Sequence, residues 1–288
     1  MKNNSIYKSS EGKSLIINHY ENIIKEWPVI NEFINLNTSL GNTFIIASGK
    51  KENKPIILLH GSSTNSVMWM GDIKRLSENH RVYAIDIIGE PGKSDENRPD
   101  MKGDHYGKWL DEILDGLNIE KAILIGNSLG GWMALKYATY KPEKVEKLVL
   151  LATSGITPAK VSFLIRVVPL MLLGKKGIDK LNRIVYGQEV IPKQALEFGN
   201  LIMKHYKPRM GSLPVFTDEE LDKLIMPTLY IGGENDALLA SRKIASRIEK
   251  LLPKSKTMVL ENTGHVLINI IDCVTLFIDG ELDVLKTN

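Results

Sequence analysis

The feature that most constrains this chain is a series of short apolar runs that alternate with amphipathic segments. The clearest runs occupy residues 55–59, 81–85, 121–125, 147–151, 227–231 and 256–260. Short runs that are apolar throughout are typical of strands buried on both faces of a sheet. Amphipathic segments with helical spacing lie between them, at residues 107–117, 129–140 and 237–252. The pattern predicts an α/β fold in which helices flank both faces of a mostly parallel sheet.

Two more strands are expected before these runs. Residues 32–36 and 43–47 read as a lead-in hairpin that turns at 40–42, which brings the expected sheet to eight strands, all but the first few of them parallel. Residues 1–31 read as an N-terminal extension that contains an amphipathic helix ending at Pro28. The extension is expected to lie outside the sheet.

The alternation of strands and helices stops between residues 155 and 217. This stretch has several prolines and apolar pieces such as 163–165 and 170–173, but no clear strand. Because expected strands lie on both sides of it, we interpret 155–217 as a helical cap inserted into a core made of 32–154 and 218–288. The alternative is a second, independent domain.

The strongest signal for chemistry is the sequence G-x-S-x-G at residues 126–130, between an expected strand and an expected helix. A turn this sharp strains the backbone of Ser128, and glycines at 126 and 130 permit close packing around it. The turn exposes the hydroxyl at the sheet edge, where a helix start offers N–H groups to a developing negative charge. Ser128 is therefore the predicted nucleophile, and the alternative is a tight turn with a capping serine.

A serine hydroxyl becomes a good nucleophile only when a base accepts its proton. Among six histidines, His265 follows the last expected strand through a loop at its carboxyl end, the sheet edge at which Ser128 also lies. His19 lies on the N-terminal helix, His80 precedes a strand, and His105 and His205 lie in polar segments. His265 is the predicted base, and the alternative is a loop histidine bonded to backbone.

The third residue should be a carboxylate after another strand. Asp236 follows the run at 227–231 and is the predicted acid, with Glu234 as the fallback. An aspartate there could instead cap the helix that follows. The order Ser128, Asp236, His265 is the order of serine, acid and histidine in α/β-hydrolases.

An oxyanion hole needs backbone donors beside the nucleophile. One donor should be the N–H of Leu129, the residue after the serine. The other should come from the loop at 60–63, where Ser62 is preferred and Ser63 is possible. His60 is expected to have a structural role beneath this loop.

Several motifs together resemble the α/β-hydrolase superfamily, and more closely its capped carboxylesterase-type members, over residues 33–278. They are His60-Gly61, Trp69, Asp86 with residues 89–94, residues 126–131, and Gly264-His265. The resemblance implies an eight-stranded sheet, a cap after the sixth strand, no cofactor and the roles assigned above. One departure lies in the pattern D-x-x-G-x-G-x-S. The pattern has one residue between its two glycines, whereas this sequence has two, Glu90 and Pro91. We expect this departure to reshape only a surface turn.

The sequence thus predicts a serine hydrolase that cleaves an ester or related acyl bond of a small, apolar substrate through an acyl-enzyme. A serine at the elbow argues against haloalkane dehalogenase and epoxide hydrolase chemistry, which use aspartate there. Two alternatives remain. One is a carbon–carbon bond hydrolase of dienoic keto acids, with Arg166 and Arg209 as candidates to bind the substrate carboxylate. The other is a ligand receptor that turns over slowly on the same fold.

Composition and spacing argue against other classes of partner. The formal net charge is +3 over 288 residues without a long basic run, so a nucleic-acid partner has little support. Gly92-Lys93-Ser94 imitates a P-loop, but that motif would require glycine at Ile87. No group of residues has metal-ligand spacing.

The cellular location is expected to be the cytoplasm. Cys273 is the single cysteine, so the fold needs no internal disulfide. The N-terminus is polar and does not resemble a signal peptide. The most apolar segment, 161–173, is shorter than the about 20 residues that span a bilayer.

Overall fold

The computed structural model describes residues 5–161, 165, 169–170, 177, 180–181, 183–185, 187, 189 and 191–282. Within these ranges eight strands form one sheet. They are β1 (Asn31–Thr38), β2 (Gly41–Ser48), β3 (Lys54–Leu59), β4 (His80–Ile85), β5 (Ala122–Asn127), β6 (Val145–Leu151), β7 (Thr228–Gly233) and β8 (Ser255–Leu260). Each strand lies where the apolar pattern predicted one, so the predicted fold class is confirmed.

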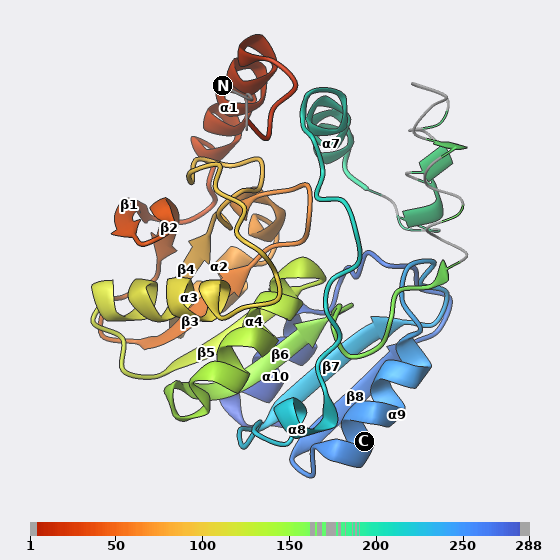
Figure 1. Cartoon of the computed structure of the whole chain (residues 1–288). Helices are drawn as coiled ribbons and strands as arrows, with labels where there is room; N and C mark the ends of the chain where they lie inside the picture. The colour runs from red at the N-terminus through yellow and green to blue at the C-terminus, as the bar shows by residue number, and fades with distance from the viewer. Residues whose placement is uncertain are drawn as a thin grey trace.

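The strands follow the order β1-β2-β4-β3-β5-β6-β7-β8 across the sheet (Figure 1). Strand β2 pairs antiparallel with both β1 and β4. All other neighbours are parallel. The prediction that only the first strands depart from the parallel direction is confirmed. Because β5, β7 and β8 run the same way, the loops that follow them meet at one edge of the sheet.

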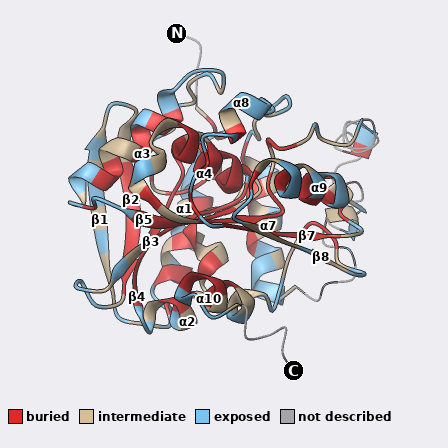
Figure 2. Cartoon of the chain, turned by 90° about the horizontal axis from the view of Figure 1, so that it is seen from below, coloured by how far each residue is buried: buried red, intermediate tan, exposed pale blue. Residues whose placement is uncertain are grey.

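Helices cover both faces of the sheet, which Figure 2 shows nearly edge-on as a band of buried residues. On one face lie α3 (His105–Gly116), α4 (Leu129–Tyr140) and α9 (Ser241–Leu251), and on the other α2 (Ile73–Ser77) and α10 (Ile271–Asp279). Shorter pieces are η1 (Ser66–Trp69), η2 (Pro142–Lys144) and α8 (Asp218–Leu221).

The two helical layers explain why the strands are apolar without alternation. In β3, Ile57 and Leu59 belong to one core, whereas Ile56 and Leu58 belong to the core on the opposite face. Side chains of a strand point alternately to its two faces, so every residue of β3 that reaches the interior must be apolar.

One predicted helix begins later than expected. The segment 237–252 was predicted as helical throughout, but α9 starts at Ser241. The Asp236 carboxylate accepts the N–H groups of Leu238 and Leu239 and holds them in a turn ahead of the helix.

The N-terminal extension packs against the helix α7 (Lys193–His205), and Figure 1 draws the two close together above the sheet. Its helix α1 spans Ser10–Ile24, so it ends before the predicted boundary at Pro28. Ahead of α1, Tyr7 forms an isolated antiparallel bridge with Tyr206. The extension therefore braces the chain that leaves α7.

The region predicted as a cap contains α7, and its assignment as an inserted cap stays a prediction. The apolar pieces named above fall mostly outside the described residues: 163–164 and 171–173. In the described ranges, no helix combines the length and apolar character needed to cross a membrane.

Candidate active site

Ser128 stands at the junction of β5 and α4 in a strained conformation, with φ of 51° and ψ of −105°. The flanking glycines are a steric requirement. A Cβ on Gly126 would lie 2.3 Å from the carbonyl oxygen of Gly130, and a Cβ on Gly130 would lie 2.0 Å from that of Leu59. Real side chains never approach backbone so closely, so only glycine fits at both positions. The strain at Ser128 follows from this close packing.

Two hydrogen bonds connect three loops at the sheet edge. His265 Nε2 lies 3.2 Å from Ser128 Oγ, and His265 Nδ1 lies 2.7 Å from Asp236 Oδ2. The serine follows β5, the aspartate follows β7 and the histidine follows β8. With the proton on Nδ1 donated to the carboxylate, Nε2 is free to accept the hydroxyl proton of Ser128. The structure thus brings together the three residues that the sequence singled out.

Asp236 has two roles at once. Its side chain is fully buried, and Oδ1 accepts the N–H groups of Leu238 at 2.7 Å and Leu239 at 3.0 Å. The other oxygen, Oδ2, is left for His265. Asp236 does not cap α9, whose N-cap residue is Ala240, so the capping alternative is wrong; the two N–H groups belong to a turn ahead of the helix, and they fix the direction of the carboxylate.

Glu234, the fallback acid, faces a different partner. Its Oε1 accepts hydrogen bonds from the guanidinium of Arg242 at the surface. Of the two carboxylates in this loop, only Asp236 contacts His265.

His60 supports the loop that follows β3. It is fully buried, its Nδ1 lies 2.8 Å from the carbonyl oxygen of Gly61, and its Nε2 accepts the N–H of Ile87 at 2.9 Å. This pattern requires a neutral ring with the proton on Nδ1, and burial lowers the pKa of His60 below its ordinary 6.5. The carbonyl of Gly61 and the N–H of Ser62 belong to one peptide, so His60 also orients that N–H.

The candidate oxyanion donors are the N–H groups of Ser62 and Leu129. A Cβ on Gly61 would lie 3.9 Å from Ser128 Cβ, so this loop runs directly beside the nucleophile. Neither N–H has a hydrogen-bond partner within the described ranges. Ser63, the other candidate, donates its N–H to Glu90 Oε2 at 2.8 Å. That bond leaves Ser62 as the candidate donor from this loop.

The expectation that Glu90-Pro91 form a surface turn is wrong. Glu90 is 0% exposed, and its carboxylate accepts hydrogen bonds from the backbone of Ser63, Tyr206 Oη and Arg209 Nε. The burial of Glu90 was not predicted because a G-x-P-G turn next to charged residues is usually exposed. Its partners Tyr206 and Arg209 are also far away in the sequence. A single acidic residue among small ones was the available signal.

Asp86, the first residue of the same motif, is a second buried carboxylate. Oδ1 accepts from the N–H and hydroxyl of Ser66 and from Tyr20 Oη, and Oδ2 accepts the N–H of Lys93. It therefore connects η1, the turn at 89–94 and α1.

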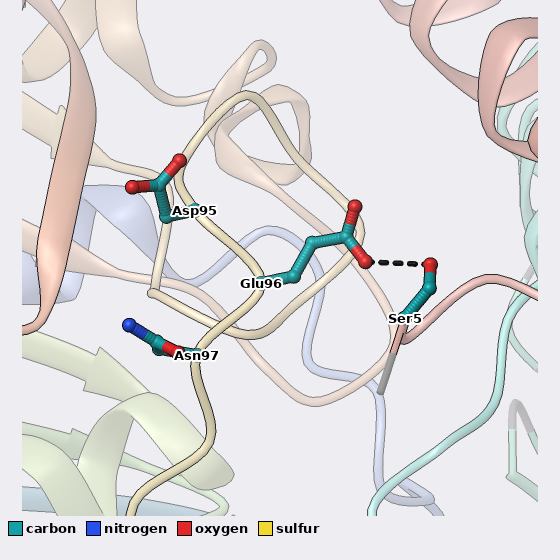
Figure 3. A pocket seen from close by; sticks show the side chains of 4 residues that line it. All are labelled: Ser5, Asp95, Glu96 and Asn97. Carbon is teal, nitrogen blue, oxygen red and sulfur yellow. Dashed lines mark hydrogen bonds between the residues drawn. The ribbon is translucent and has the colours of Figure 1, made fainter. Parts of the chain in front are cut away.

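A hollow of about 360 Å³ lies at the N-terminal segment, lined by Ser5, Asp95, Glu96 and Asn97 (Figure 3). Both carboxylates that line the hollow, those of Asp95 and Glu96, already accept hydrogen bonds from the protein. Glu96 accepts from Ser5 Oγ, the N–H of Ile6 and Lys13 Nζ, and Asp95 accepts the N–H of Asn42. The hollow contains none of the residues of the hydrogen-bonded relay. Over the described ranges, no three His, Cys, Asp or Glu side chains gather as a metal site.

Comparison with known proteins gives consistent matches. A family model described as the alpha/beta hydrolase fold matches residues 54–175. The uncharacterized carboxylesterase nap of Bacillus subtilis (strain 168) is 33% identical over 86% of this chain and 85% of its own length. Carboxylesterase YbfK of the same organism is 31% identical over 86% of each chain.

The solved structures agree. The crystal structure of naproxen esterase (carboxylesterase NP) from Bacillus subtilis matches with a TM-score of 0.82 and 26% identity, covering 97% of this chain and 99% of that one. The crystal structure of carboxylesterase CesB (YbfK) from Bacillus subtilis matches with a TM-score of 0.80 and 26% identity, over 96% of this chain and 98% of that one.

The two acidic residues after β7 should differ sharply in their effect on ester turnover. Asp236→Asn should lower kcat/KM by about 10²- to 10⁴-fold, because the amide favours the wrong imidazole tautomer. Glu234→Gln, the matched control in the same loop, should change kcat/KM by less than about threefold because it removes only a surface ion pair. Losses in the reverse order, measured with one chromogenic ester, would move the acid role to Glu234.

Acid should destabilise the fold partly through His60. Its pKa is lowered in the folded chain, so the unfolded chain binds the proton first and stability falls as pH drops below about 6.5. The contribution of one such group is at most about 1.4 kcal/mol per pH unit. His60→Gln should be less stable than wild type at pH 8 yet lose less between pH 6.5 and 5, as measured by urea unfolding. Identical losses over that interval would contradict the assignment.

Proposed function

Because this chain belongs to the α/β-hydrolase family and is related to two Bacillus subtilis carboxylesterases at 33% and 31% identity, we propose that it is a serine carboxylesterase. Ser128 is the nucleophile, His265 the general base and acid, and Asp236 the residue that orients the imidazole. The observation that carries the proposal is the continuous relay from Asp236 Oδ2 through His265 to Ser128 Oγ on a strained elbow.

In the acylation half-reaction, Ser128 Oγ attacks the carbonyl carbon of the ester while its proton passes to His265 Nε2. The carbonyl oxygen becomes an oxyanion, which accepts hydrogen bonds from the N–H groups of Ser62 and Leu129. Collapse of this intermediate breaks the bond to the alcohol oxygen. The proton on Nε2 passes to that oxygen, and the alcohol leaves.

In the deacylation half-reaction, a water molecule gives one proton to His265 Nε2 and attacks the acyl carbon. The same two N–H groups stabilise the second oxyanion. Its collapse releases the carboxylic acid, and the proton on Nε2 returns to Ser128 Oγ. Throughout both halves the Asp236 carboxylate stays ionised and stabilises the imidazolium that forms beside it. The two bonds from Leu238 and Leu239 hold the carboxylate in place for this role.

The proposed substrate is a small ester with an apolar acyl or alcohol group. The support is the composition of the region between β6 and β7, where Val161, Ile165 and Leu170 are apolar side chains. The relatives nap and YbfK are named as carboxylesterases, which agrees with an ester as substrate.

For the carbon–carbon bond hydrolase alternative, Arg209 is not available to bind a substrate carboxylate. Arg209 donates to Glu90, to the carbonyl of Ile88 and to Tyr106 Oη, so its guanidinium is already committed within the protein. Arg166 lies outside the described residues. No contact within the described ranges favours recognition of a substrate carboxylate over an ester.

Removal of the nucleophile tests the proposal. Ser128→Ala should lower turnover of p-nitrophenyl butyrate by at least about 10³-fold, since the relay residues act as a unit. The melting temperature should stay close to that of wild type, because the hydroxyl contributes nothing to the core. Ser154→Ala is a matched control, since it removes a nearby hydroxyl and keeps the backbone bond from its N–H to Ser128 O. If the Ser128→Ala protein folds and keeps most of its activity, the assignment of Ser128 as the nucleophile is wrong. A wild-type protein that binds esters without hydrolysing them would favour the receptor alternative.

Substrate length should matter if the acyl group is apolar. Each added methylene that is buried contributes roughly 0.8 kcal/mol, so kcat/KM should rise about three- to fourfold per carbon until the pocket is full. Leu170→Ala should shift the optimal length with a small change in melting temperature. A fixed length profile together with a large loss of stability would show that Leu170 is core, and the apolar-substrate proposal would then be abandoned.

A further inference from the structure

A carboxylate with no exposed surface lies directly behind the loop that supplies the proposed oxyanion donor. Glu90 Oε2 accepts the N–H of Ser63 at 2.8 Å and the hydroxyl of Tyr206 at 2.9 Å, and Oε1 accepts Arg209 Nε at 3.0 Å. The relay of serine, histidine and aspartate does not include Glu90. A buried charge is tolerated when donors surround it, and here they come from two distant parts of the chain.

The donors on the far side of Glu90 are themselves fixed. Arg209 also donates to Tyr106 Oη at 2.6 Å and to the carbonyl of Ile88 at 3.3 Å. Tyr206 is 1% exposed, and burial raises its pKa well above the ordinary 10, so its hydroxyl stays protonated and donates to Glu90 at neutral pH. The position of Glu90 is therefore set by the segment that follows α7.

On the near side, the loop needs an anchor because its backbone is strained. Ser63 has a φ of 59°, in the left-handed region that residues other than glycine rarely adopt. His60 holds the Gly61 carbonyl before Ser62, and Glu90 holds the Ser63 N–H after it. Ser62 is thus fixed from both sides. Loss of either anchor would let its N–H turn away from the oxyanion.

We propose that Glu90 is a positioning residue: by binding the Ser63 N–H it aligns the Ser62 N–H with the oxyanion, and Tyr206 and Arg209 fix its own place. The inference rests on the proposed esterase function, because it assigns Glu90 a part in the same reaction. Glu90 contacts no reacting atom. Its effect should therefore appear in the rate of the chemical steps and hardly at all in substrate binding.

A pair of double variants separates this role from simple structural support. Glu90→Gln/Arg209→Met removes the buried ion pair but keeps an amide oxygen that can accept the Ser63 N–H. Glu90→Leu/Arg209→Met removes the same pair and keeps no acceptor. Both avoid the uncompensated buried arginine that a single substitution at Glu90 would leave. The Tyr206 hydroxyl lies 3.4 Å from the carbonyl of Gly89, so it retains an acceptor in both.

Steady-state kinetics on p-nitrophenyl butyrate and the rate of inactivation by a fluorophosphonate should be measured for both variants and for wild type. The glutamine variant should keep kcat within about fivefold of wild type. The leucine variant should lose about 10- to 100-fold in kcat, with KM changed less than about threefold, since a misaligned oxyanion donor weakens only the transition state. The inactivation rate should fall in parallel, and the two melting temperatures should be similar.

Equal kcat values for the two double variants would overturn the proposal, and so would a loss confined to KM. The fluorophosphonate keeps this result distinct from failure of the esterase function. A wild-type protein that is phosphonylated but hydrolyses no ester would refute the esterase proposal. The ratio of inactivation rates between the leucine and glutamine variants would still decide the role of Glu90.

Discussion

The close approach of α4 to the ends of β3 and β5 is the constraint on which the candidate site depends. No Cβ fits at Gly126 or Gly130 without displacing backbone. Because the helix begins so near the sheet, the chain must turn within one residue, and Ser128 takes the positive φ of that turn. The same approach places the first N–H of α4 beside the loop after β3. The proposed nucleophile and the proposed oxyanion donors thus owe their positions to one packing contact.

Buried carboxylates hold the surrounding loops, and each one is surrounded by donors. Asp236 is bound by two backbone N–H groups and His265, Asp86 by Ser66, Tyr20 and Lys93, and Glu90 by Ser63, Tyr206 and Arg209. A buried charge without such partners would be costly, so these networks specify one arrangement of the loops. Glu90 and Asp86 also connect the site to the segment after α7 and to α1, which gives the N-terminal extension a role in supporting the site.

The sheet and the relay were predictable because each leaves a local signal. Runs buried on both faces marked the strands, and the rule that parallel strands end at one edge selected His265 and Asp236 from many candidates. The surroundings of Glu90 were not predictable, because its partners Tyr206 and Arg209 lie 116 and 119 residues away along the chain. The start of α9 was missed for a related reason. Residues 237–240 continue the helical spacing of α9, but the Asp236 carboxylate accepts the N–H groups of Leu238 and Leu239 and holds them in a turn.

The central claim is that Ser128 is a single activated nucleophile. The most direct measurement is intact-protein and peptide mass spectrometry after incubation with a fluorophosphonate. One adduct per chain is predicted, located on the peptide that contains Ser128 and absent from Ser128→Ala. Labelling in wild type should slow strongly when His265 is replaced by glutamine, because the hydroxyl then has no base. An unlabelled protein, an adduct on another residue, or labelling that does not depend on His265 would contradict the account.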